Sequence, residues 1–136
     1  MNINDIKVTP LKQIFDYRGK VMHMMRNDDV YFQKFGEIYF STVHPGIVKG
    51  WHFHERMDLS YACIYGKIKL VVTDGKEFRE FYLSPENYQL IQIPHGLWNG
   101  FKGIGSDEAI IANCASIPHD PNEIHTMSQD NFKYIW

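Results

Sequence analysis

The chain has 136 residues, the usual length of one domain and enough to bury a hydrophobic core. Its 14 Lys and Arg against 16 Asp and Glu leave a formal charge of −2 without a long run of like charges, so we expect neither nucleic acid nor a membrane as a partner. The first residues lack the basic and apolar stretches of a secretory signal. We therefore expect a single domain over residues 1–136 in a cytoplasmic protein.

Short segments rich in β-branched and aromatic residues recur along the chain, separated by Gly, Pro, Asn and Asp. Alternation of Ile68, Leu70 and Val72 with lysines is typical of a strand with one buried face, and Asp74-Gly75 favours a tight hairpin. Without a long amphipathic helix, the pattern predicts an all-β antiparallel sandwich or barrel of the jelly-roll type. The predicted strands are residues 7–11, 21–25, 37–43, 47–54, 59–65, 67–73, 77–83, 88–93, 98–103 and 109–115.

The first candidate binding residue precedes the strand predicted at 21–25. Asp16-Tyr-Arg-Gly19 places Arg18, a permanent cation, beside a glycine turn. A guanidinium can bind two phosphate oxygens at once, so Arg18 suits a diphosphate. The alternative is an arginine in an ordinary surface turn.

The strand predicted at 37–43 carries a second group of candidates. Tyr39 shares one face with Glu37 and Ser41 because side chains alternate along a strand. This face could present a phenol to a cavity. A buried tyrosine with a purely structural role is the alternative.

The strand predicted at 47–54 has the strongest functional signal. His52 and His54 are two positions apart, so their imidazoles should face the same side of the strand. We expect Gly50 to share that face and leave room beside the rings. Lys49 and the two aromatic residues of the segment are expected on the opposite face.

Two inward histidines allow three interpretations. They could be satisfied core groups, metal ligands or an acid–base pair. As ligands they would need a third donor such as Asp58, as in the His-His-carboxylate sites of non-haem iron, and Asn99 would be a weak fourth. As acid–base groups they titrate near neutrality and need only a carbon acid or hydroxyl within reach. The missing fourth ligand favours the acid–base interpretation, with no metal or cofactor.

The C-terminal third adds one candidate and one structural expectation. Residues 93–101 predict strand, turn and strand, with Asn99 able to point inward. The polar stretch from Pro118 ends in Asn131–Trp136. We expect a short helix or turn there, followed by an apolar anchor.

The histidine segment and the second block resemble the two cupin motifs, with Asp58 for the usual Glu and Asn99 for the second-motif His. Four blocks in order are also similar to the dTDP-4-dehydrorhamnose 3,5-epimerase family, and they cover most of the chain. These blocks are Asp16–Gly19, Glu37–Ser41, Gly46–His52 and Ile93–Phe101.

The resemblance implies a cupin jelly roll, a homodimer with exchanged N-terminal strands, and a nucleotide-linked 4-keto-6-deoxy sugar as substrate. His52 matches the family's catalytic base and Arg18 its Asp-x-Arg-Gly arginine. Lys49 stands where the family has a substrate-binding Arg, and Asn99 replaces a histidine. The resemblance offers no counterpart for the carboxylate behind the catalytic histidine, so we expect that group to be absent.

The sugar 3,4-ketoisomerases of the same superfamily are also similar, with a His-x-His pair like His52 and His54 and a tyrosine near the place of Tyr39. Both groups remove an acidic proton beside a ketone and return a proton elsewhere. We expect His52 as the base and His54 or Tyr39 as the returning acid.

The remaining candidate residues are expected to bind the substrate. Arg18 and Lys49 would hold the diphosphate, Glu37 would contact the substrate, and Asn99 would donate to the enolate oxygen. Epimerisation in deoxysugar or polysaccharide biosynthesis is the first expectation and ketoisomerisation the alternative. A metal-dependent cupin using His52, His54 and Asp58, and a non-catalytic sugar-binding cupin, stay open.

Overall fold

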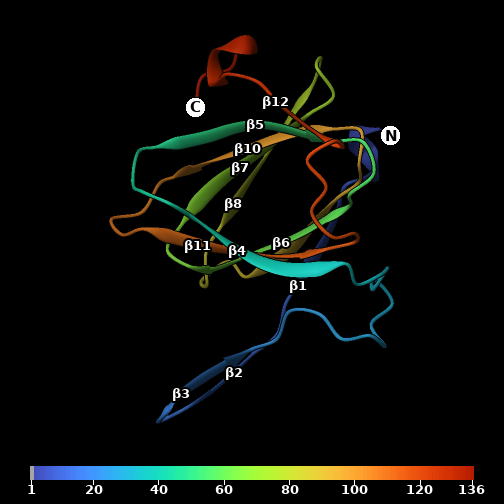
Figure 1. The fold of residues 1–136 in the computed structure, drawn as a ribbon. Coiled ribbons are helices and arrows are strands. Elements are labelled where there is room, and N and C mark those ends of the chain that lie inside the picture. Colours follow the sequence, from blue (N-terminus) through green and yellow to red (C-terminus); the bar gives the residue numbers. More distant parts are fainter. Residues whose placement is uncertain (1) are drawn as a thin grey trace.

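Two five-stranded antiparallel sheets lie face to face in the computed structural model, which describes residues 2–136 (Figure 1). These residues contain no α-helix, so the predicted all-β jelly-roll architecture is confirmed. In spatial order, the first sheet contains β1 (Lys7–Pro10), β9 (Gln89–Ile93), β6 (Leu59–Tyr65), β11 (Ala109–Ala115) and β4 (Glu37–Val43). The second contains β12 (Ile124–Thr126), β5 (Val48–His54), β10 (Trp98–Gly103), β7 (Ile68–Thr73) and β8 (Phe78–Leu83).

Apolar side chains from the inner faces of both sheets fill the space between them. Ile68, Leu70 and Val72 of β7 are fully buried, as their alternation predicted. Tyr61 on β6 meets Phe101 on β10 edge to face, with ring centroids 6.3 Å apart. Polar side chains inside such a core are exceptions that normally have hydrogen-bond partners. The buried polar side chains are therefore the starting point for locating the candidate site.

Most predicted strands are confirmed, and four have the predicted bounds: 37–43, 59–65, 98–103 and 109–115. The strand predicted at 21–25 is wrong in its bounds, because β3 (Gly19–Met22) begins earlier and pairs with an unpredicted strand, β2 (Gln13–Asp16). The short strand β12 was also not predicted. Both missed strands are largely exposed, so no burial pattern marks them in the sequence.

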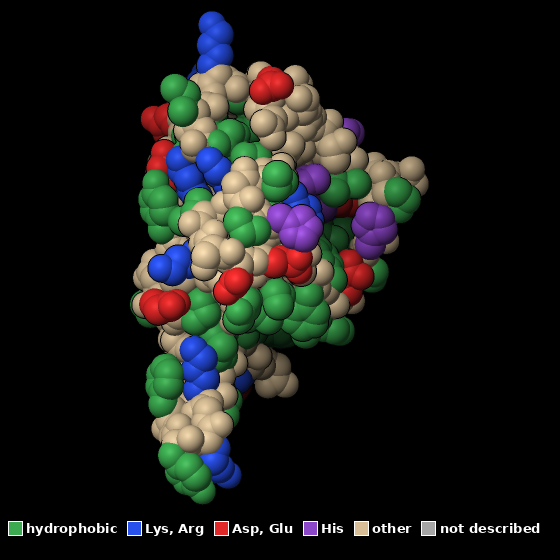
Figure 2. Space-filling model, turned by 90° about the vertical axis from the view of Figure 1, so that its left-hand side faces the viewer, with side chains coloured by type: hydrophobic (Ala, Val, Ile, Leu, Met, Phe, Trp, Pro, Cys, Tyr) green, Lys and Arg blue, Asp and Glu red, His purple; other side chains and the backbone are tan. Residues whose placement is uncertain are grey.

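The β2–β3 hairpin extends away from the first sheet as a separate two-stranded arm (Figure 1). Gly19 closes its turn with a φ of 151°. Ile14, Phe15 and Val21 on the arm are exposed. Figure 2 shows hydrophobic and basic side chains together on this arm.

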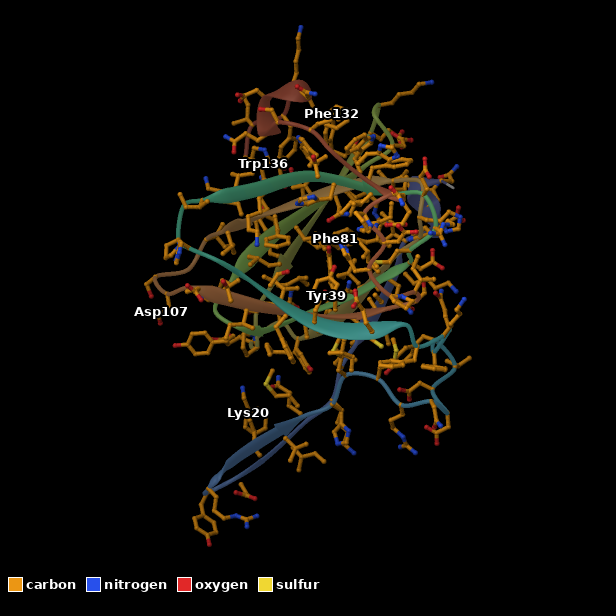
Figure 3. All side chains as sticks on the ribbon, in the orientation of Figure 1. Lys20, Tyr39, Phe81, Asp107, Phe132 and Trp136 are labelled. Carbon is orange, nitrogen blue, oxygen red and sulfur yellow. The ribbon has the colours of Figure 1, made fainter. Side chains whose placement is uncertain are left out.

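The C-terminal segment lies on the outer face of the second sheet. After the 3₁₀-helix η2 (Gln129–Asn131), the rings of Phe132 and Trp136 lie 5.1 and 4.9 Å from that of Trp51 on β5. Figure 3 shows Phe132 and Trp136 on the opposite side of this sheet from Tyr39. The expected helix or turn followed by an apolar anchor is therefore confirmed.

Across residues 2–136, no helix has the length and apolar character that crossing a bilayer requires.

Candidate active site

A β-bulge in β5 sets the orientation of the site residues. His52 pairs with Asn99 of β10, but Gly50 pairs with the next residue, Gly100, so the intervening Trp51 has no partner on that strand. Directly paired residues share a face of the sheet. Lys49 pairs with Phe101, whose ring belongs to the core, so Lys49 faces inward with His52.

The bulge overturns two expectations about this strand. Gly50 does not share the face of the histidines, because a Cβ built on it would point at Trp136, 3.4 Å away on the outer side. Lys49 does not face away from them. Its ammonium lies 5.8 Å from the centre of the Phe101 ring and donates to the carbonyl oxygen of Thr42 on β4 at 3.1 Å. The cation thus lies at the edge between the two sheets.

His54 forms a buried pair with Glu123, a residue that sequence reasoning did not single out. Nδ1 of His54 and a carboxylate oxygen of Glu123 share a hydrogen bond, and the two residues are 6% and 2% exposed. The other carboxylate oxygen accepts from the backbone N–H groups of Arg56 and Met57 at 2.9 and 2.8 Å. The carboxylate thus stands behind His54, whereas the sequence comparison considered such a group only behind His52.

The protonation states in this pair follow from its surroundings. Burial alone would raise the pKa of Glu123, but the hydrogen bonds from His54 and the two backbone groups outweigh it, and the net pKa is lowered. An ionised carboxylate only accepts, so Nδ1 of His54 carries the proton and Nε2 is left as the basic nitrogen. His54 is thereby oriented as a proton acceptor.

His52 lies on the same inner face, but its ring lacks a hydrogen-bond partner like the one that His54 has. Its Nδ1 is buried without a hydrogen-bond partner. Burial, followed by the neighbouring His54 and Lys49, lowers the pKa of His52 below its usual 6.5. His52 is therefore a neutral imidazole at pH 7.

Across from the histidines, β4 contributes Glu37 and Tyr39. Together with His54, these two line a cavity of about 330 Å³, to which Met57, His119 and Ile124 also contribute. Its size is within the range of small-molecule sites, roughly 300–1,000 Å³. Burial raises the pKa of Tyr39, and the Glu37 charge adds to the effect, so the phenol stays protonated. A proton donor and a proton acceptor thus face one hollow.

Asn99 is buried, as expected for an inward residue, and lies directly opposite His52. Its side-chain oxygen accepts from the Tyr61 hydroxyl at 3.4 Å, and its nitrogen donates to the backbone oxygen of His52 at 3.4 Å. Both distances are long for hydrogen bonds. The amide therefore has donor capacity left inside the barrel.

Arg18 is not near these residues in the same chain. It lies at the tip of the β2–β3 arm, where its guanidinium pairs with Asp16 at 2.7 Å and its side chain is 74% exposed. The structure therefore brings together Glu37, Tyr39, Lys49, His52, His54 and Asn99, and leaves Arg18 outside.

The alternative His-His-carboxylate metal triad is not assembled. Asp58 binds His95 instead, at 2.8 Å from Nδ1 and 2.9 Å from the backbone nitrogen. Within residues 2–136, no three His, Cys, Asp or Glu side chains lie close enough together to hold a metal. The alternative grouping of Asp58 with His52 and His54 is therefore not found among these residues.

Sequence reasoning missed Glu123 and His119. Both lie in the polar segment that follows Pro118, where no strand pattern marks a direction for any side chain. Glu123 reaches the site because Asp120 accepts from its backbone N–H and β12 then pairs with β5. Only that long-range pairing, which the sequence does not signal, places the carboxylate under His54.

The two facing sheets form a cupin jelly roll with a polar cavity at one edge. Residues 4–135 match the family described as FdtA: WxcM-like, C-terminal. The probable low-salt glycan biosynthesis epimerase Agl13 of Haloferax volcanii is 31% identical over 121 residues, 82% of this chain and 78% of that protein. The TDP-4-oxo-6-deoxy-alpha-D-glucose-3,4-oxoisomerase of Aneurinibacillus thermoaerophilus is 24% identical, over 93% of this chain and 89% of its own.

A solved structure agrees with these sequence relatives. The dTDP sugar isomerase from Desulfovibrio desulfuricans superimposes with a TM-score of 0.93 at 37% identity, covering 97% of this chain and 90% of that one. The chain therefore belongs to the WxcM-like, C-terminal (FdtA) family of cupins. The resemblance to the dTDP-sugar epimerases and ketoisomerases is confirmed.

Proposed function

We propose that this protein is an isomerase of nucleotide-linked 4-keto-6-deoxy sugars, with a dTDP sugar as the first candidate substrate. The observation that carries the proposal is His54, paired with the buried Glu123 and facing the same cavity as Tyr39. This arrangement suits a reaction in which one group removes a proton and another returns it. It requires no cofactor.

In the proposed mechanism, Nε2 of His54 removes a proton from a carbon beside the C4 ketone. The Glu123 carboxylate stabilises the imidazolium that forms, and the ketone becomes an enolate. The Lys49 ammonium and the Asn99 amide stabilise the developing oxygen charge. The protonated Tyr39 phenol then returns a proton.

This assignment refines the one made from the sequence, which gave the base to His52. Glu123 supports His54 in that role, because a carboxylate on Nδ1 fixes the ring orientation and the tautomer, leaving Nε2 as the accepting nitrogen. Because the pKa of His52 is lowered, its imidazole is neutral beside Lys49 and can contact the reacting sugar. Its role here is to orient the substrate and to exchange protons with the enolate oxygen.

Epimerisation is the first proposal, in which the proton returns to the other face of carbon 3 or carbon 5. In ketoisomerisation the C4 oxygen and carbon 4 instead gain protons, while the C3 hydroxyl loses its proton and becomes the new ketone. The His52-x-His54 pair and the similarity to the oxoisomerase of A. thermoaerophilus favour this second candidate. Deoxysugar or polysaccharide biosynthesis is the proposed context in both cases.

We also propose that the protein acts as a homodimer in which the β2–β3 arm reaches the second subunit. The exposed apolar residues of the arm, and the exposed Ile38 and Phe40 on the outer face of β4, support such a contact. A hollow of about 700 Å³ lies between the arm and the first sheet, lined by Phe15 and Tyr65 among others. Arg18 would then bind the diphosphate in the partner's site.

An NMR time course with dTDP-4-keto-6-deoxyglucose in heavy water tests the proposal. The wild type should exchange the proton at carbon 3, carbon 5 or both, and the carbon-13 spectrum reports whether the ketone moves. His54→Asn should abolish exchange, and His52→Asn should slow it. His125→Asn is the matched control, because His125 is exposed and pairs only with Glu55.

Three outcomes decide between the alternatives. Exchange at normal rate in His54→Asn contradicts the mechanism. Binding of the dTDP sugar without any exchange by the wild type supports the non-catalytic sugar-binding cupin instead. Movement of the ketone from carbon 4 to carbon 3 selects the ketoisomerase.

A further inference from the structure

The C-terminal Trp136 occupies a slot on the outer side of the strands that carry the candidate site. Its indole lies against Gly50 of β5 and Gly100 of β10, where Cβ atoms would stand 3.4 and 3.1 Å from the ring. A Cβ on Gly100 would also stand 2.9 Å from the Cα of Gly50. The two glycines therefore allow both the close approach of the strands and the seating of the indole.

The segment around Trp136 is held on the sheet by several contacts. Tyr134 donates to Glu80 on β8 at 2.8 Å and lies 4.9 Å from the Lys69 ammonium. Tyr134 and Trp136 meet edge to face with centroids 5.1 Å apart. The exposed Ile135 between them takes no part.

The same segment supplies hydrogen-bond partners for the backbone of the bulge. Trp51, which has no partner on β10, exchanges two backbone hydrogen bonds with Met127, at 2.8 and 3.0 Å. Its indole N–H donates to the backbone oxygen of Gln129 at 3.3 Å, and its ring packs against Trp136. The bulged residue is thus bound by the C-terminal segment instead of the neighbouring strand.

The bulge decides which side chains enter the barrel. Residues three apart in a regular strand lie on opposite faces, yet Lys49 and His52 are three apart and both face inward. Without the extra residue, pairing of β5 with β10 would turn Lys49 outward. The cation at the site therefore depends on the bulge.

We propose that Trp136 is a positioning residue: by filling the Gly50–Gly100 slot against Trp51, it holds the bulge that brings Lys49 beside His52. The consequence for catalysis rests on the proposed function, but the arrangement itself does not. The charged and titratable groups that act on His52 are Lys49 and His54 on its own strand, while its partner on β10 is the neutral Asn99. NMR signals of His52 and Lys49 can therefore show whether the bulge is intact in the absence of substrate.

The test is a titration of the histidine ring protons by NMR in the full chain without substrate, comparing wild type and Trp136→Ala. In the variant, the pKa of His52 should rise by about half a unit or more, since Lys49 withdraws and water enters. The chemical shift of the Lys49 protons next to its ammonium should change, because the ammonium leaves its place 5.8 Å from the centre of the Phe101 ring. Ile135→Ala is the matched control and should change neither signal.

Two more variants keep the test decisive. Trp136→Phe retains a flat ring and should restore most of both signals. If Trp136→Ala does not fold, Trp136→Leu should show the same changes, because it keeps apolar contact with Trp51 without a ring in the slot. Unchanged His52 and Lys49 signals in a folded Ala or Leu variant overturn the inference. Absence of sugar exchange in the wild type would end the proposed function and leave this inference intact.

Discussion

Glu123 and His54 are 69 positions apart in the sequence, and their side chains form a buried hydrogen-bonded pair beneath the cavity. The carboxylate is fixed from its other side by two backbone N–H groups, so it cannot turn away from the imidazole. This pair fixes the imidazole of His54 in one tautomer and one ring orientation.

Glu123→Gln should slow substrate proton exchange about 100-fold or more, because an amide of the same size cannot stabilise the imidazolium. The free energy of unfolding should fall by about 1–3 kcal/mol through the damaged buried network. Exchange kinetics and urea unfolding measure the two effects. Glu55→Gln is the control, since Glu55 is an exposed carboxylate that also pairs with a histidine. Equal rates in the two variants would contradict the role of Glu123.

Tyr39→Phe should separate the two halves of the reaction. His54 can still remove the proton, so exchange with heavy water should stay within about tenfold of wild type, while product formation falls about 100-fold. Proton NMR of substrate and product follows both rates in one sample. Tyr65→Phe serves as the control, because that phenol is exposed and hydrogen-bonds Asp107 instead. A proportional loss of exchange and product would assign Tyr39 to proton removal.

The stability of the fold should decline in acid in two stages. The pKa of His52 is lowered from 6.5 in the folded state, so the unfolded chain binds a proton more readily and stability falls as the pH drops below about 6.5. Glu123, with its pKa lowered from 4.5, adds a second loss below about 4.5. Urea unfolding across this pH range measures both stages. His52→Asn should remove the first stage only, and an unchanged profile in that variant would refute the assignment.

The dimer proposal predicts that a charge on the outer face of β4 separates the subunits. Phe40 is 61% exposed in the single chain, and Phe40→Glu should convert a dimer to a folded monomer. Light scattering after size-exclusion chromatography measures the mass. Ile104→Glu, at a 41% exposed apolar residue outside that face, should leave the dimer intact. A wild-type monomer at micromolar concentration would rule the proposal out.

The features that could be predicted from the sequence are those that follow from the alternation of buried and exposed residues along a single strand. Alternation marked β7, and the two histidines two apart were correctly expected on one inward face. Asn99 was expected to be able to point inward, and it does so opposite His52. Each of these inferences needed only the period of two within one segment.

The parts that could not be predicted depend on contacts between distant segments. The inward turn of Lys49 needs the bulge, whose unpaired Trp51 is bound by Met127. Glu123 reaches His54 only through the pairing of β12 with β5, a strand of three residues with little apolar character. The β2 strand stands apart from the core, so no buried face repeats in its sequence.

The bulge in β5 divides the strand into two halves with opposite parity. Before Trp51 the odd-numbered Lys49 points into the barrel, and after it the even-numbered His52 and His54 do. Anyone redesigning the pocket must therefore choose positions separately on the two sides of Trp51. A substitution pattern carried straight through from one half to the other would place charges in the aromatic layer beneath Trp136 and leave the cavity unaltered.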